Sequence, residues 1–146
     1  MWQSRRVGEQ RYYAFLRAIN TGRRRLTNEQ LVSPFHELGF TEVAAYQAAG
    51  NVTFRSADAA EVDERRIEAA LADSYGFETP TFVRSAAEIE AIATSEPFTE
   101  HELARTTGKV QVTFLRSALP PDRSAAMLAL VPPDDRVVVS GREWYW

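Results

Sequence analysis

The sequence YYAFLRAI, residues 12–19, is aromatic and branched and contains no residue that favours a turn. Such a composition is typical of a strand that is buried on at least one face. Alternation along this strand places Tyr13, Phe15, Arg17 and Ile19 on one side. The segment therefore predicts the first strand of a sheet, in which Arg17 is partly buried if that side is covered.

A helix is predicted directly after this strand. The polar residues 20–25 break the strand pattern, and Thr27 followed by Gln30 has the spacing of a capping box. Gly39 is a favourable helix end, because glycine readily adopts the left-handed conformation that often follows the last helical turn. The helix is therefore expected from Thr27 to Leu38.

The next segments complete the first unit of the fold. They are expected to be a hairpin, an amphipathic helix and a strand, at residues 43–47 with 52–55, 59–75 and 79–84. The resulting order, strand-helix-strand-strand-helix-strand, is that of a ferredoxin-like βαββαβ unit.

The second half of the chain predicts a shortened copy of that unit. Ser85 and Glu88 form a second capping box, which opens a short helix, and residues 96–108 are expected to be a connector. A strand, a helix and two strands are then expected at residues 110–116, 120–130, 136–140 and 143–146. The predicted fold class is α+β, with a ferredoxin-like βαββαβ unit in residues 1–84 followed by an incomplete βαββ unit in residues 85–146.

The composition excludes several kinds of site. The chain has 146 residues, a formal net charge of -3, no cysteine and a single lysine, Lys109. An acidic balance disfavours binding of nucleic acid through the overall field, and the absence of cysteine excludes disulfides, thiolate nucleophiles and cysteine-ligated metals. No window is long and apolar enough to cross a membrane or serve as a secretory signal. A cytoplasmic protein with no membrane partner is therefore expected.

Catalytic machinery is not recognisable in the sequence. There is no Walker-type phosphate loop, no His-Glu-x-x-His motif and no Gly-x-Ser-x-Gly elbow. His36 is expected in the core or on a helix surface. Residues 100–102, Glu-His-Glu, are expected in a solvated loop, because adjacent side chains do not make a metal site without further ligands. No cofactor or metal is predicted, and the sequence leaves open whether the protein is an enzyme.

Three segments together resemble a known family. They are LRAINTG at residues 16–22, ELGF at residues 37–40 and AGNVTF at residues 49–54. In this order and spacing they are similar to the bacterial domain of unknown function 1697, whose members typically carry Leu-Arg-Gly-Ile-Asn-x-Gly-Gly-Lys after the first strand and Ser-Gly-Asn in the hairpin. The resemblance implies a fold and candidate positions, without an established activity.

The chain departs from the family pattern at several positions. Ala18 stands where a glycine is usual, Arg23 and Arg24 stand where Gly-Lys is usual, and Ala49 replaces the serine before Gly50. The likeness runs from about residue 12 to the end, and the family tends to continue further with a Thr-Arg-Asn-Trp motif. A C-terminally shortened member is therefore expected.

Two polar motifs are expected to meet at one edge of the sheet. In a split βαβ unit the first and third strands are antiparallel neighbours, so the end of the first lies beside the start of the third. Guanidinium groups, loop amides and a helix N-terminus are the ingredients of an anion site. The candidate ligand-binding residues are Arg17, Asn20, Gly22, Arg23, Gln47, Gly50 and Asn51. The predicted ligand is a small anion such as a phosphate or carboxylate.

Other interpretations of these residues stay open. The glycines and asparagines of the two motifs have a structural interpretation, as suppliers of positive φ and of bonds within their own loops. A nucleic-acid platform would need Tyr13, Phe15 and Phe54 to stack bases, whereas ordinary burial preferences favour packing of these aromatics in the core. An incomplete second copy leaves a sheet edge uncovered, which predicts a protein-interaction module or homodimer as the alternative function.

Overall fold

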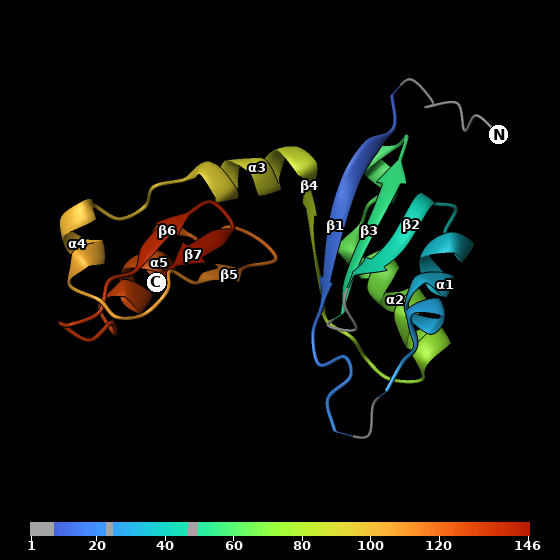
Figure 1. The fold of residues 1–146 in the computed structure, drawn as a ribbon, viewed down its shortest axis with the longest axis horizontal. Coiled ribbons are helices and arrows are strands. Elements are labelled where there is room, and N and C mark those ends of the chain that lie inside the picture. The colour runs from blue at the N-terminus through green and yellow to red at the C-terminus, as the bar shows by residue number, and fades with distance from the viewer. Residues whose placement is uncertain (1–7, 23–24, 47–49) are drawn as a thin grey trace. The chain divides into compact units, whose positions relative to one another are not determined.

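The computed structural model of the protein describes residues 8–22, 25–46 and 50–146. Its elements in chain order are β1 (Gln10–Leu16), α1 (Asn28–Glu37), β2 (Thr41–Tyr46), β3 (Asn51–Ser56), the 3-10 turn η1 (Ala59–Glu61), α2 (Glu64–Tyr75), β4 (Thr81–Ser85), α3 (Ala86–Thr94), α4 (Glu100–Ala104), β5 (Val112–Phe114), α5 (Pro121–Leu128), β6 (Val138–Ser140) and β7 (Glu143–Tyr145) (Figure 1). Among the described residues, none of these helices has the length and apolar character needed to cross a bilayer.

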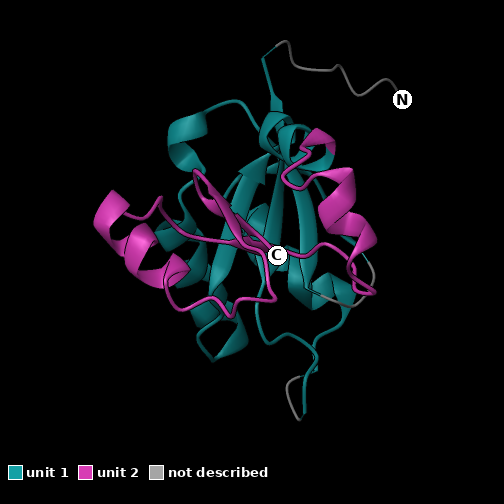
Figure 2. Cartoon of the chain, turned by 90° about the vertical axis from the view of Figure 1, so that its left-hand side faces the viewer, with its two compact units in different colours: residues 1–93 teal, residues 94–146 magenta. Residues whose placement is uncertain are grey.

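The chain divides into two compact units, unit 1 at residues 1–93 and unit 2 at residues 94–146 (Figure 2). The division lies near the end of α3. The sequence analysis instead placed the boundary before this helix, after residue 84. The reason is that α3 starts at the residue that follows β4, with no linker between them. The expected capping box holds this junction, since Ser85 N–H donates to Glu88 Oε1 at 3.1 Å and Glu88 N–H donates to Ser85 Oγ at 3.2 Å.

Unit 1 has the predicted ferredoxin-like topology. Its four-stranded sheet has the order β2-β3-β1-β4, and each neighbouring pair is antiparallel. Helices α1 and α2 cover the same face of the sheet (Figure 1). Thr27 caps α1 through the predicted capping box with Gln30. The helix expected from residue 59 begins later, at Glu64, because Asp58 caps only a 3-10 turn and Asp63 caps the α-helix itself.

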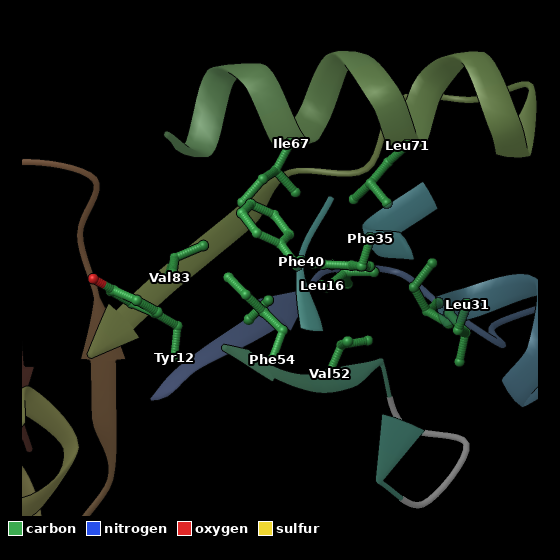
Figure 3. Close-up of a cluster of buried hydrophobic side chains, with 12 residues drawn as sticks. Tyr12, Leu16, Leu31, Phe35, Phe40, Val52, Phe54, Ile67, Leu71 and Val83 are labelled. Carbon is green, nitrogen blue, oxygen red and sulfur yellow. The ribbon is translucent and has the colours of Figure 1, made fainter. Parts of the chain in front are cut away.

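The core of unit 1 lies between that sheet face and the two helices. Even-numbered positions of β1 and β3 point toward the helices, so that Tyr12, Leu16 and Phe54 are buried against Phe35 and Ile67 (Figure 3). Phe54 is the centre of an aromatic cluster, with ring centroids 5.6 Å from Tyr12, 5.5 Å from Phe35 and 4.4 Å from Phe40, and its own ring is 0 % exposed. Burial of such a cluster is the main favourable term in the stability of this unit.

A polar contact links the two helices at the edge of the core. The Tyr75 hydroxyl at the end of α2 donates to the main-chain carbonyl of Leu31 in α1 at 2.7 Å. Burial raises the pKa of Tyr75 well above its ordinary value. The hydroxyl is therefore protonated throughout the neutral range and keeps its role as donor.

Unit 2 has the strand-helix-strand-strand order that the sequence predicts. Its three-stranded sheet has the order β5-β7-β6, with both pairs antiparallel. This is the first, third and second strand of a βαββ segment, the same order as β1-β3-β2 in unit 1. The expected connector, residues 96–108, differs from the prediction because it contains α4, which a capping box between Thr99 and Glu102 stabilises.

Unit 2 buries few apolar side chains. Of residues 94–146, all of which the structure describes, Tyr145 is the single buried hydrophobic residue. Trp146 is 52 % exposed although its indole Nε1–H donates to Thr113 Oγ1 at 3.3 Å. The large exposed hydrophobic residues of this unit are Leu103, Val110, Val112, Met127, Leu128, Leu130 and Trp146. The unit therefore presents much apolar surface to solvent.

Candidate functional site

The end of β1 lies beside the start of β3, as the topology predicts. Phe15 is the Cα partner of Asn51, and Leu16 N–H donates to the carbonyl of Gly50 at 2.8 Å. Arg17 N–H donates to the carbonyl of Pro80, the residue before β4, at 2.9 Å. Three neighbouring segments of the sheet thus fix the point at which the chain leaves β1 and enters the polar turn of residues 17–22.

This turn has an unusual backbone. Ala18, Asn20 and Gly22 have φ of 57°, 57° and 58°, whereas the residues between them do not have positive φ. The handedness of the backbone therefore alternates from residue to residue. Runs of alternating handedness turn successive main-chain N–H groups toward one side, and this arrangement can form an anion-binding concavity.

Asn20 closes the loop. Its side-chain Oδ1 accepts a hydrogen bond from Leu26 N–H at 2.6 Å, which brings the end of the loop back to the turn. Arg25, the residue before Leu26, is exposed and lies next to this closure. The N-terminus of α1 follows at Thr27, whose hydroxyl accepts from Gln30 N–H at 3.1 Å. The structural interpretation of Asn20 is thus supported by a bond, and the bond also places Arg25 near the turn.

Gly50 has a steric role at this junction. Its φ is 80°, and a Cβ built on it would lie 2.8 Å from the carbonyl oxygen of Leu16 and 3.1 Å from the Cβ of Ile19. Only a residue without a Cβ fits this position without displacement of β1 or of the turn. Asn51, the next residue, is half-buried in β3 opposite Phe15 and Tyr46.

The placement of Arg17 corrects one expectation. The sequence pattern put Arg17 among the half-buried side chains of β1, but the strand ends at Leu16 and Arg17 is exposed in the following turn. Alternation stops where the ladder stops, so the pattern does not extend to residue 17 or to Ile19, which is buried instead. Of the other candidate residues, Gly22 is exposed, and Arg23 and Gln47 lie outside the described residues.

The aromatic residues considered for base stacking do not form one platform. Phe54 pairs with Tyr12 and faces the helices, where it is fully buried. Tyr13 and Phe15 point to the opposite face, because successive strand residues alternate. A shared stacking surface of the three rings would need them on one exposed face, so the nucleic-acid hypothesis loses its specific support.

The acidic segment at residues 100–102 is helical rather than a loop. It forms α4, and no group of three or more potential ligands that could hold a metal ion occurs among the described residues. The hydrogen bond from Thr99 N–H lowers the pKa of Glu102, with a further contribution from Arg136 at 3.5 Å. These side chains thus serve the helix cap and a surface ion pair.

Unit 2 contains a pocket of about 500 Å³ that the sequence did not indicate. Apolar side chains from both ends of the unit line it, among them Phe98, Leu103 and Trp146. Charged side chains on its wall include Lys109 and Asp134. The Thr-x-x-Glu motif at residues 99–102 is a capping-box signal for the start of a helix at this position. The sequence prediction instead treated these residues as part of a connector.

A substitution at Ala18 tests the backbone of the turn. A residue with a Cβ costs about 1–2 kcal/mol in the left-handed region. Glycine at position 18 removes this cost. It also lowers the free energy of unfolding by about 0.4–1 kcal/mol, because the unfolded chain with glycine has a larger conformational entropy. Ala18→Gly is therefore expected to stabilise the protein by about 0.5–1 kcal/mol in urea unfolding.

Ala69→Gly is the matched control for that substitution. Ala69 is exposed within α2, so glycine there should destabilise by about 0.5–1 kcal/mol. A loss of stability for both variants would show that residue 18 does not hold a left-handed conformation.

The fold and the candidate site define an α+β protein with a ferredoxin-like unit, a second small antiparallel sheet and a polar turn at the end of β1. The family described as a protein of unknown function (DUF1697) matches residues 10–145. The chain belongs to this family, as the motifs in its sequence indicated.

A solved structure has the same fold. The conserved bacterial protein SP0830 from Streptococcus pneumoniae is 22 % identical to this chain, with a TM-score of 0.71, and the match covers 94 % of this chain and 76 % of that chain. At this level of identity the likeness concerns the fold alone. No curated protein matches the chain.

Proposed function

We propose that residues 17–22, together with Arg25, bind a small anionic ligand through a phosphate or carboxylate group. The observation that carries this proposal is the alternating handedness of residues 17–22 between two exposed arginines, Arg17 and Arg25. Family membership leaves the function open, so the proposal depends on the chemistry of this loop.

The main chain of the turn offers donors. Within the described part of the chain, the N–H groups of Ala18, Thr21 and Gly22 form no hydrogen bond. All three residues are exposed, so a ligand can reach their amides. An oxyanion is the natural partner, because it accepts several N–H groups at once and gains from their combined dipoles.

The two arginines add charge to these donors. Among the described residues, neither Arg17 nor Arg25 forms an ion pair or a side-chain hydrogen bond. A guanidinium group matches the geometry of a phosphate or carboxylate through two parallel N–H donors. Because the whole chain carries a net charge of -3, a pair of unneutralised arginines makes this loop a local exception that would attract anions.

The test is an NMR titration of main-chain amides with inorganic phosphate and with pyrophosphate, at constant ionic strength set by chloride. The wild type should show saturable shifts at Ala18, Thr21 and Gly22. A double variant, Arg17→Ala with Arg25→Ala, should bind roughly tenfold more weakly or worse, since a charge-assisted hydrogen bond contributes about 1.5–3 kcal/mol.

The control is a second double variant, Arg65→Ala with Arg123→Ala. It removes the same charge from two exposed positions outside the loop and should bind like the wild type. Equal weakening in both double variants would mean that the anions respond to net charge only, and shifts spread over the whole protein without saturation would contradict a site at this loop.

A second candidate function, protein interaction, is favoured by the surface of unit 2. One buried hydrophobic residue and seven large exposed ones are unusual for a unit of this length. Exposed apolar surface of this kind commonly marks a contact with another chain. Homodimerisation is the form of this interaction that the sequence predicted.

A further inference from the structure

The surface of unit 1 carries one aromatic side chain that does not belong to the core. Tyr46, at the end of β2, is 62 % exposed, and among the described residues of unit 1 it is the single exposed large hydrophobic residue. Ala45 packs against the core, so Tyr46 points to the opposite face of the sheet, away from α1 and α2. The preceding residue on that face of β2 is Ala44, whose side chain is too small to cover the ring. A ligand can therefore reach the flat side of Tyr46.

A polar side chain lies beside this ring. Asn51, at the start of β3, is the direct partner of Tyr46 across the antiparallel pair, so the two side chains lie on the same face of the sheet. Asn51 is half-buried, and its amide forms no hydrogen bond within the described part of the chain. A side-chain amide offers both donors and an acceptor. Tyr46 and Asn51 thus combine a stacking surface with a group that can form hydrogen bonds to the edge of a ring.

Both residues are close to the polar turn of residues 17–22. Gly50, which precedes Asn51, accepts the N–H of Leu16, the last residue before the turn, at 2.8 Å. Gly50 also approaches the turn itself, because a Cβ built on it would lie 3.1 Å from the Cβ of Ile19. The turn, Asn51 and Tyr46 therefore follow one another at the same end of β1, β3 and β2, and neighbouring strands are about 4.8 Å apart. A small molecule can span this distance.

We propose that the ligand of the turn is a single nucleotide, a nucleoside monophosphate. Its phosphate binds the N–H groups and arginines of the turn, its base stacks on Tyr46, and the amide of Asn51 forms hydrogen bonds to the edge of the base. A longer nucleic acid is disfavoured, because the chain carries a net charge of -3. This inference rests on the proposed anion site and adds the class of ligand that occupies it.

NMR titrations of the full chain with adenosine monophosphate, ribose 5-phosphate and inorganic phosphate separate the contribution of the base from that of the phosphate. Adenosine monophosphate should bind at least about fivefold more tightly than ribose 5-phosphate, since stacking of a base on an aromatic side chain contributes such a factor or more. The main-chain amides of Ala18, Thr21 and Gly22 should shift with all three compounds. The ring protons of Tyr46 should shift with adenosine monophosphate alone.

Three variants test the role of the ring. Tyr46→Ala should lower the affinity for adenosine monophosphate to that for ribose 5-phosphate, and it should leave the affinity for ribose 5-phosphate unchanged. Tyr46→Phe keeps a ring that can stack and should bind like the wild type. Trp146→Ala is the matched control, because it removes an aromatic side chain of comparable exposure, 52 %, from unit 2. This variant should also bind like the wild type.

A variant of Asn51 tests the recognition of the base edge. Stacking alone tolerates every base, so any preference among the four nucleoside monophosphates should come from hydrogen bonds. Asn51→Ala should reduce that preference, with an unchanged affinity for ribose 5-phosphate as the control for an intact turn.

The outcomes distinguish this inference from the anion site on which it rests. Equal affinities for adenosine monophosphate and ribose 5-phosphate in the wild type overturn the nucleotide inference and leave the anion site in place. Tight binding of adenosine monophosphate to Tyr46→Ala also overturns it, because the base then lies elsewhere. If none of the three compounds shifts the amides of the turn, the anion site fails and the nucleotide inference fails with it.

Discussion

Gly50→Ala is expected to destabilise the protein by about 3 kcal/mol or more, because the substitution combines two costs. The left-handed φ of 80° disfavours any residue with a Cβ by about 1–2 kcal/mol. In addition, the Cβ would lie 2.8 Å from the Leu16 carbonyl oxygen, a backbone atom that cannot rotate away. Overpacking of this kind costs a further 1–3 kcal/mol, roughly. Urea unfolding followed by circular dichroism measures the loss.

Gly76→Ala separates these two costs. Gly76 ends α2 with a φ of 79°, almost the same as that of Gly50, but a Cβ there meets nothing within 4 Å. This variant should lose only about 1 kcal/mol, so the difference between the two variants measures the steric contact alone. If both glycines tolerate alanine equally, the close approach of Gly50 to β1 is not present in solution.

Phe54→Ala is the second large effect, with an expected loss of about 3–5 kcal/mol. Phe54 is fully buried, and its ring contacts those of Tyr12, Phe35 and Phe40. Truncation removes the favourable burial of one ring and leaves a cavity that the strand backbone cannot close. The expected result is a large fall in the urea midpoint with an unchanged slope, as measured by tyrosine and tryptophan fluorescence.

Tyr46→Ala is the control for the loss of an aromatic residue from the same sheet. Tyr46 is 62 % exposed at the end of β2, so its truncation should cost well below 1 kcal/mol, roughly. A comparable loss in both variants would mean that the effect of Phe54→Ala does not come from the core.

The role of Gly50 affects how the proposed anion site should be tested. Ile19, which packs against Gly50, lies inside the turn of alternating handedness, so a change at Gly50 also displaces Ala18 and Asn20. Loss of anion binding in Gly50→Ala would therefore have two explanations. Substitution of Arg17 and Arg25, which are exposed and form no ion pair among the described residues, removes charge without this disturbance.

The sequence predicted those elements of the fold that depend on interactions between a few neighbouring residues. The capping boxes at Thr27 with Gln30 and at Ser85 with Glu88 form as predicted, because each consists of bonds between residues three apart. The same motif at Thr99 caps α4, where the sequence had predicted a connector. The order of elements was enough to indicate the ferredoxin-like unit and the βαββ segment that follows it, since few topologies connect such elements.

Tertiary structure decided the properties that depend on where a ladder ends and on what lies across it. Whether Arg17 is buried depends on where the hydrogen bonds of β1 end. The neighbouring strands β3 and β4 determine this point, and the sequence of β1 alone does not. The face of Phe54 depends on its pairing with Tyr12, and the need for glycine at position 50 depends on the approach of Leu16 and Ile19 from another segment. Such contacts join residues that are far apart in the chain, so the periodicity and spacing of the sequence do not predict them.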